Sequence, residues 1–382
     1  MSSIPQDALS AALFTAPKAA ARTLPADLLG RVSHELHQDG DVFVASGHRR
    51  TLEALDPRTG ASRWRTDLPT PDLTTPVTSP DGAVWVSGEH ALSAFDAATG
   101  KPRGAWDTGA RYGLQPVARP EGGVVIGNWE NRTLAVVVPG SETPLWTSAV
   151  GYTSQPPVAA PGRVYVNVGN GGVQALDGET GAPLWKAEVG GALSSPPAVG
   201  PDGTVYSAST RVDTRESTGL LVALDPEDGE TLWTFATPAG LSASAVPSPE
   251  GHTVYLGTRE GRVHALDAET GKPRWSVKTH GPVVVPPGLS EGLLCIADDR
   301  SGVLMVRAED GLVLAEAELD SSPQSAPIPV GPGTFLVPTV FGHGVEVSLS
   351  SPAAPEIVER PAGTIVTGGS EVQIGGIRLP IR

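Results

Sequence analysis

Three short motifs in the chain resemble sequences that carry chemistry elsewhere, and each lacks something that its chemistry needs. His34-Glu-Leu-His37 places its histidines three residues apart, whereas the zinc site of a metalloprotease helix places them four apart. Thr99-Gly-Lys101 lacks the leading glycine and the following hydroxyl residue of a phosphate-binding loop. Gly169-Asn-Gly-Gly172 is followed by no helical pattern, so it does not match a dinucleotide-binding turn. These motifs predict no catalytic residue and no metal site.

A second set of residues suits binding. Arginine, tyrosine and tryptophan dominate protein-binding hot spots because they combine a large contact area with directional polar groups. Residues of this kind, with a few polar neighbours, stand between the apolar runs of the chain, where connecting loops are expected to carry binding groups. The candidates are Arg49, Arg50, Arg111, Tyr112, Trp129, Tyr152, Arg211, Arg215, Asp298, Arg300, Phe341 and His343.

Two of these candidates, Arg211 and Arg215, lie in the polar stretch 209–218, which is about eight residues longer than its counterparts elsewhere in the chain. We expect it to be a loop that projects into solvent. It is either an arm that binds a partner or a tolerated surface insertion, since lengthening a surface loop costs little free energy.

The elements that must position these residues come from one motif repeated about every forty residues. Leu-x-Ala-Leu-Asp-x-x-Thr-Gly-x-x-x-Trp occurs with small changes at 52–64, 92–106, 173–185, 221–233 and 263–275, and in a degenerate form at 134–146. The aspartate can accept N–H groups of the turn that follows it, and the tryptophan can bury a large area while its indole N–H bonds to backbone. We expect structural docking roles for Asp56, Trp64, Asp96, Trp106, Trp146, Asp177, Trp185, Asp225, Trp233, Asp267 and Trp275.

The period defines eight units. The apolar centre of the second strand in each unit falls at Phe43, Trp85, Val125, Tyr165, Tyr206, Tyr255, Cys295 and Leu336, with steps of 40–42 residues and one of 49. Four short strands repeated radially form a β-propeller blade. We therefore predict an all-β protein with a single eight-bladed β-propeller of four-stranded antiparallel blades. The repeats occupy residues 31–358, and terminal strands from segments 1–30 and 359–382 close the ring, the latter completing the last blade.

The charge and composition of the chain limit the classes of binding partner and the compartment that we expect. The net charge of −15 repels nucleic-acid phosphates, and no apolar run approaches the length of a membrane span. The single cysteine, Cys295, lies in an apolar run, so we expect a buried, inert thiol and no intramolecular disulfide. With no recognisable secretory signal, a cytoplasmic, monomeric ring is expected, and a periplasmic location is the alternative.

The motif resembles the PQQ-like (quinoprotein-type) β-propeller repeat, whose hallmark is Ala-x-Asp-x-x-Thr-Gly-x-x-x-Trp. The match is strong at 54–64, 94–106, 175–185, 223–233 and 265–275. The third unit departs from it at Val138 and Glu142, and the seventh at Arg307 and Ala315, while the eighth has lost the motif. The resemblance implies a ring that is closed by pairing strands from both termini.

The resemblance implies two kinds of function. In quinone-dependent dehydrogenases the repeat holds PQQ and Ca²⁺ over the ring axis, and most soluble alcohol-oxidising members also use a disulfide that a single cysteine cannot make. In the propeller lipoprotein subunit of the bacterial outer-membrane β-barrel assembly machinery, similar in size and blade count, the ring is a scaffold. That subunit needs a lipobox cysteine near the N-terminus, which is missing here.

The missing quinone machinery favours the scaffold. We expect a non-catalytic propeller that binds a protein or peptide through one face of the ring and holds no cofactor. The alternative is a quinone-dependent or sugar-processing enzyme with a site at the mouth of the central channel, built from Arg49, Arg111, Asp298 and Arg300.

Overall fold

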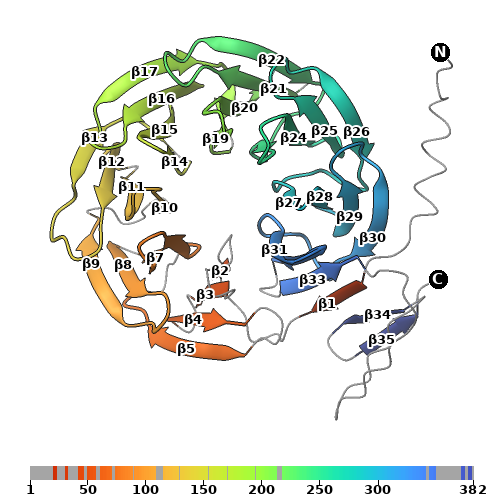
Figure 1. Ribbon diagram of the computed structural model, residues 1–382, viewed down its shortest axis with the longest axis horizontal. Helices are drawn as coiled ribbons and strands as arrows, with labels where there is room; N and C mark the ends of the chain where they lie inside the picture. The colour runs from red at the N-terminus through yellow and green to blue at the C-terminus, as the bar shows by residue number, and fades with distance from the viewer. Residues whose placement is uncertain are drawn as a thin grey trace.

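The chain is described from a computed structural model, and every regular element among the residues that it describes is a β-strand. The described residues are 20–23, 31–32, 42–46, 50–56, 61–70, 74–88, 90–108, 115–128, 130–153, 155–169, 171–193, 195–212, 217–340, 344–349, 371–374 and 377–380. Within this part of the chain, eight antiparallel sheets of four or five strands stand in a ring (Figure 1). The same part holds no helix long and apolar enough to traverse a bilayer.

The first four blades each contain four strands in sequence order, from the ring axis outward. Blade 1 holds β2 (Arg31–Val32), β3 (Val42–Ser46), β4 (Thr51–Leu55) and β5 (Ser62–Asp67). Blade 2 holds β6 (Val77–Ser79), β7 (Ala83–Ser87), β8 (Ala91–Asp96) and β9 (Pro102–Asp107). Blade 3 holds β10 (Val117–Ala118), β11 (Val124–Asn128), β12 (Thr133–Val137) and β13 (Trp146–Ala149). Blade 4 holds β14 (Val158–Ala160), β15 (Arg163–Val168), β16 (Gly172–Asp177) and β17 (Pro183–Glu188).

The remaining blades depart from this plan at two places, blade 5 and blade 8. Blade 5 holds β18 (Ala192–Leu193), β19 (Ala198–Val199), β20 (Val205–Val212), β21 (Ser217–Leu224) and β22 (Thr231–Thr237). Blade 6 holds β23 (Val246–Pro247), β24 (Thr253–Thr258), β25 (Arg262–Asp267) and β26 (Pro273–Lys278). Blade 7 holds β27 (Gly288–Ser290), β28 (Leu293–Ala297), β29 (Gly302–Arg307) and β30 (Val313–Glu318). Blade 8 holds β31 (Ile328–Gly331), β32 (Thr334–Pro338), β33 (Gly344–Ser348) and, as its outermost strand, β1 (Ala20–Thr23).

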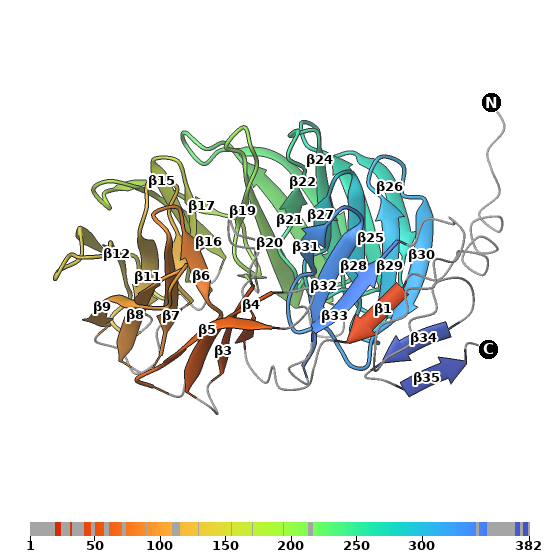
Figure 2. The ribbon, with the colours of Figure 1, turned by 60° about the horizontal axis from the view of Figure 1, so that its bottom comes forward.

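The ring is closed by β1, which pairs antiparallel with β33 from Ala20 opposite Ser348 to Thr23 opposite Val345. The expected closure by a terminal strand is therefore present. The C-terminal segment does not complete the last blade as expected, because β1 already occupies the outer edge of β33. Instead β34 (Glu371–Ile374) and β35 (Ile377–Pro380) pair with each other outside the ring, beside β1 (Figures 1 and 2).

The core lies between blades. The second strands are the most buried elements because side chains on both of their faces meet a neighbouring blade; every residue of β7, β11, β24 and β28 is buried. In β20, Tyr206 faces blade 6, whereas Val205 faces blade 4. The outer strands are much more exposed, and in β17 only Trp185 is buried. Cys295 lies in the apolar cluster between blades 7 and 8, so its predicted burial is confirmed.

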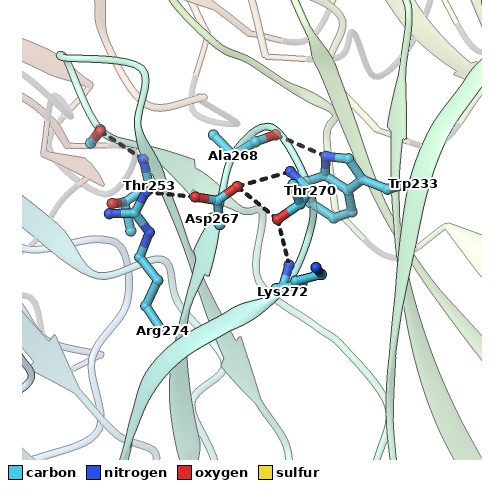
Figure 3. Close-up of polar contacts among 8 residues, drawn as sticks. Trp233, Thr253, Asp267, Ala268, Thr270, Lys272 and Arg274 are labelled. Carbon is cyan, nitrogen blue, oxygen red and sulfur yellow. Dashed lines mark hydrogen bonds and ion pairs between the residues drawn. The ribbon is translucent and has the colours of Figure 1, made fainter.

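The repeated motif docks each blade onto the next. In blade 6, Asp267 Oδ1 accepts hydrogen bonds from Thr270 N at 2.9 Å and Thr270 Oγ1 at 2.7 Å (Figure 3). This turn presents the carbonyl of Ala268, which accepts the indole N–H of Trp233 from blade 5 at 2.8 Å. The indole also covers Gly271, where a Cβ would lie 2.5 Å from Cε3 of Trp233. Position 271 therefore requires glycine, because it lies beneath the indole ring of Trp233.

The same indole hydrogen bond links six successive pairs of blades. The pairs are Trp64 with Ala97 O, Trp106 with Ser141 O, Trp146 with Gly178 O, Trp185 with Pro226 O, Trp233 with Ala268 O and Trp275 with Ala308 O. The degenerate third unit still supplies an acceptor, Ser141 O, although Val138 replaces the aspartate. Blade 7 carries Ala315 in place of the tryptophan, and that residue packs in the cluster with blade 8.

Candidate functional site

The hairpins between second and third strands and the links from each outer strand to the next blade share one face of the ring, which we call the loop face. Backbone hydrogen bonds tie described links to neighbouring hairpins. Leu68 N donates to Arg50 O at 2.7 Å, and Thr279 N donates to Gly261 O at 2.9 Å. The opposite face, called the turn face, carries the Asp-x-x-Thr-Gly turns. The loop face is thus a connected surface on a rigid scaffold, the setting in which binding loops are usually found.

The structure describes five of the predicted binding residues. Arg50, Tyr152, Arg211 and Arg300 are exposed on the loop face, whereas Asp298 is buried there. The guanidinium of Arg50 donates to Pro69 O. The others, Arg49, Arg111, Tyr112, Trp129, Arg215, Phe341 and His343, lie outside the described residues.

Asp298 is not the exposed binding group that its sequence position indicated. Its side chain is only 1% exposed and serves its own hairpin. Oδ1 accepts hydrogen bonds from Arg300 N at 2.9 Å and Gly302 N at 3.1 Å, and Oδ2 accepts one from His280 N at 3.1 Å. A carboxylate satisfied by three backbone N–H groups shapes the loop and has little capacity left for a ligand.

The stretch 209–218 is also different from the expected loop. Its two ends continue β20 and β21, so that Arg211 lies opposite Thr218 and Val212 opposite Ser217. The short strand β18 pairs with this extension through Ala192 opposite Thr210. Polar residues indicated a loop, yet strand pairing uses backbone groups that polar residues also have. The blade 5 hairpin is therefore a longer strand pair at least as far as Val212 and Ser217.

Tyr152 and Arg211 belong to one patch of connected segments on blades 4 and 5. Gly169 N donates to Tyr152 O at 2.8 Å, which joins the Tyr152 link to the blade 4 hairpin. Gly171 O of that hairpin accepts hydrogen bonds from Val189 N at 2.7 Å and Gly190 N at 3.1 Å. The next link then reaches Arg211, whose Nη2 would lie 3.1 Å from a Cβ placed on Gly190.

Glycine makes this patch possible. Gly171 has a φ of +106°, and a Cβ there would lie 2.8 Å from Gly191 O, so the two segments approach each other more closely than a side chain allows. Tyr152 is 50% exposed and Val212, beside Arg211, is 79% exposed. We call Tyr152, Gly190, Gly191, Arg211 and Val212 the blade 4–5 patch. Tyr152 and Arg211 can be recognised in the sequence by residue type, whereas the glycine pair and Val212 cannot, because adjacent glycines look like an ordinary turn.

The turn face of blade 2 has a recess, but its side chains are not arranged to bind a ligand. A recess of about 560 Å³ on the turn face of blade 2 is lined by Asp81, Gly82, Asp96, Ala98, Thr99, Lys101 and Arg103. Its polar groups bond to one another: Arg103 Nη1 donates to Asp81 O at 2.8 Å, and Thr99 Oγ1 donates to Asp96 Oδ1 at 2.7 Å. The recess therefore follows from the architecture of the turns.

We expected no nucleophilic-serine motif from the sequence, but one with the right spacing is present. Gly288-Leu-Ser-Glu-Gly292 has the spacing of a nucleophilic-serine turn. That chemistry requires a sharp turn between a strand and a helix. Here β27 ends at Ser290 and the chain turns directly into β28, so the motif is a hairpin turn and Ser290 is not presented as a nucleophile.

The residues described at the channel mouth do not fit a quinone–calcium site. Calcium takes six to eight oxygen ligands, mostly carboxylates and carbonyls. Among the described residues, no three His, Cys, Asp or Glu side chains come together in a way that could hold a metal ion. Asp298, the carboxylate proposed for this site, already accepts hydrogen bonds from its own hairpin and from the link at His280.

Radial four-stranded sheets joined by tryptophan docking define a propeller of PQQ-like repeats. The chain belongs to the family described as outer membrane protein assembly factor BamB, which matches residues 16–126, 130–216 and 217–347. Among curated proteins, none matches the chain by sequence.

Solved structures share the fold at low sequence identity. BamB from Moraxella catarrhalis is 16% identical, with a TM-score of 0.64 over 87% of this chain and 97% of that one. Saccharomyces cerevisiae Sqt1 is 10% identical, with a TM-score of 0.72 over 88% and 100%. Quinohemoprotein alcohol dehydrogenase from Comamonas testosteroni is 15% identical, with a TM-score of 0.60 over 94% and 80%. Because these include both an assembly factor and a dehydrogenase, the shared fold does not select a function.

Proposed function

We propose that this protein is a non-catalytic scaffold that binds a protein or peptide partner through the loop face, with the blade 4–5 patch as the principal contact. Support comes from one observation above all: an exposed tyrosine, an exposed arginine and an exposed valine stand on connected, glycine-packed segments. Tyr152 and Arg211 are of the types that dominate binding hot spots. The backbone that carries them is held by hydrogen bonds, so little order has to be gained on binding.

The family relationship supports the same proposal, because the matching family is named for an assembly factor. The chemistry of the patch suggests the kind of partner. Arg211 favours a carboxylate or a backbone carbonyl, while Tyr152 and Val212 favour an apolar side chain beside it. A partner segment with an acidic residue next to an apolar one would satisfy both.

The experiment compares partner recovery by purified variants from an extract of the source cell. The combined variant Tyr152→Ala with Arg211→Glu should lower recovery of the partner about 30-fold or more, the loss expected for a hot spot of about 2 kcal/mol. Lys101→Glu makes the same charge reversal on the turn face and should leave recovery unchanged. Equal recovery by all three proteins would refute the loop-face proposal.

A further inference from the structure

The outermost strand of a blade has one unpaired edge, which can pair with a strand from another molecule. Within the described residues, β22 ends its sheet and no strand pairs with its outer edge. Figure 1 shows it at the circumference of the ring. Natural sheets protect such edges with charges, prolines, short strands or a covering element. The outer strands of this ring can be compared on those features.

Every other outer strand carries at least one of these protections. The strands β5, β9, β17, β26 and β30 contain charged residues, and β9, β17 and β26 also begin with proline. The strands β13 and β1 are four residues long, and β1 lies beside β34. In contrast, β22 is seven residues long and reads Thr-Leu-Trp-Thr-Phe-Ala-Thr, with neither charge nor proline.

The composition of β22 favours strand pairing. Threonine, tryptophan and phenylalanine are common in strands because they fit a pleated, half-buried surface. Leu232 is 51% exposed, and Thr231, Thr234 and Ala236 are exposed as well, so the edge offers an apolar anchor between small uncharged side chains. Among the described outer strands, β22 is the longest, and it carries no charge.

The charges beside β22 indicate what would pair with it. The turn that leads into the strand carries exposed Glu227, Asp228 and Glu230. Glu227 forms an ion pair with Arg163 at 2.6 Å, whereas Asp228 and Glu230 pair with no cation of the described residues. A second copy of the chain would bring another net charge of −15 and another acidic turn, which opposes self-association.

We propose that the outer edge of β22 is a second binding surface, which accepts an extended segment of a different protein as an added antiparallel strand of blade 5. The segment alternates apolar and small polar residues, so that its apolar side chains meet Leu232. Because the added strand is antiparallel, its C-terminal end lies beside the acidic turn and carries lysine or arginine. Main-chain hydrogen bonds supply affinity, and the basic end fixes direction. This surface is separate from the loop face and does not depend on the function proposed for it.

The test uses the full chain and a fluorescent nine-residue probe peptide of alternating threonine and valine with two lysines at its C-terminus. We expect saturable binding that weakens as salt rises, together with slower amide hydrogen exchange in residues 231–237. A probe with glutamates in place of the lysines should bind at least tenfold more weakly. No binding at millimolar probe, or slower exchange in another strand only, would overturn the proposal.

Matched variants locate the surface. Thr234→Lys places a charge at the centre of the edge and should weaken probe binding at least tenfold. Thr147→Lys makes the same change at the equivalent position of β13 and should have no effect. Equal binding by both variants would contradict the assignment to β22.

Sedimentation of the free protein tests whether a second copy of the chain occupies the edge. Self-association that Thr234→Lys abolishes would identify a second copy as the occupant and would overturn the proposal that a different protein supplies the strand. The exchange experiment on the unaltered chain stands even if a variant does not fold.

Discussion

Arg307 binds both carboxylate oxygens of Asp310, three residues later in the same turn, with Nε 2.8 Å from Oδ1. The ion pair stands where other blades have an aspartate–threonine pair, as between Asp267 and Thr270. It lowers the pKa of Asp310 to about 2 and raises that of Arg307. The seventh turn thus keeps its form with different chemistry, and it still presents Ala308 O to Trp275 at 3.1 Å.

The two chemistries of this turn can be exchanged. Arg307→Asp alone should lower the urea midpoint, because it places a second carboxylate beside Asp310 and removes the only cation of the pair. The double variant Arg307→Asp with Asp310→Thr rebuilds the sequence of the other turns and should restore the midpoint. The measurement is equilibrium unfolding followed by tryptophan fluorescence. A single variant as stable as the unaltered protein would show that the pair is dispensable.

Gly271 should tolerate a side chain less well than Gly292, although both have positive φ, of +67° and +73°. Gly271→Ala combines backbone strain of about 1–2 kcal/mol with overlap against Trp233, which costs about 1–3 kcal/mol more. A Cβ on Gly292 meets nothing within 4 Å, so Gly292→Ala should cost only the strain. The free energy of unfolding of the two variants measures the difference. Equal losses would mean that the indole moves aside freely.

Acid should weaken the docking turns. The Thr270 hydroxyl and Arg274 lower the pKa of Asp267 from 3.8 to about 2. A carboxylate whose pKa is lower in the folded state stabilises the protein above its unfolded-state pKa, and this contribution disappears as the pH falls through the folded-state pKa. The stability difference between the unaltered protein and Asp267→Asn should therefore be constant above about pH 5 and shrink progressively below about pH 4, with most of it lost by about pH 2. Unfolding curves at several pH values test this, and a difference as large at pH 2 as at pH 7 would contradict it.

Cys295 should be unreactive while the ring is folded. Its side chain is 0% exposed, and burial raises the pKa of the thiol far above its ordinary value. The thiolate is the reactive form, so modification requires unfolding of the interface between blades 7 and 8. A chromogenic disulfide reagent should react only at the rate of unfolding and immediately in denaturant. Rapid labelling under native conditions would show that this interface opens independently.

The blade 5 hairpin should depend on one hydroxyl. Thr210 Oγ1 accepts a hydrogen bond from Leu241 N and donates one to Leu241 O, both at 2.9 Å. Thr210→Val keeps the shape but loses both bonds, at a cost of about 1–3 kcal/mol. We expect faster amide hydrogen exchange at 209–212 and 217–220. Exchange in the part of blade 5 nearer the turn face should be unchanged. Ser207→Ala, on the same strand and without a described partner, is the control.

The sequence predicted the fold well because its strongest signals are local. An aspartate, a glycine and a tryptophan at fixed spacing specify a turn and an outer strand within about a dozen residues, and the regular spacing of the apolar second strands gives the number of blades. The partner of each indole could not be identified in the same way. Ala268, for example, lies 35 residues from Trp233 and contributes a backbone carbonyl, which any residue possesses.

The candidate site was predicted less well for the same reason. Asp298 looks like an exposed loop carboxylate until three backbone N–H groups from two segments converge on it. The ends of 209–218 look like loop because their side chains are polar, yet β18 stabilises them from another part of the chain. β1 has no distinctive pattern, and its place in blade 8 depends on the vacant edge of β33.

The position of β1 has a consequence for synthesis of the protein. The ribosome makes Thr23 well before its partner Val345, which follows only after residues 24–344. At about 5–20 residues per second, the strand waits roughly 16–64 s for its blade. During that time each new blade receives the indole of the blade made just before it, from Trp64 to Trp275. Assembly can therefore proceed in the order of translation, although β1, which is made before the other strands of the ring, is the last of them to be paired.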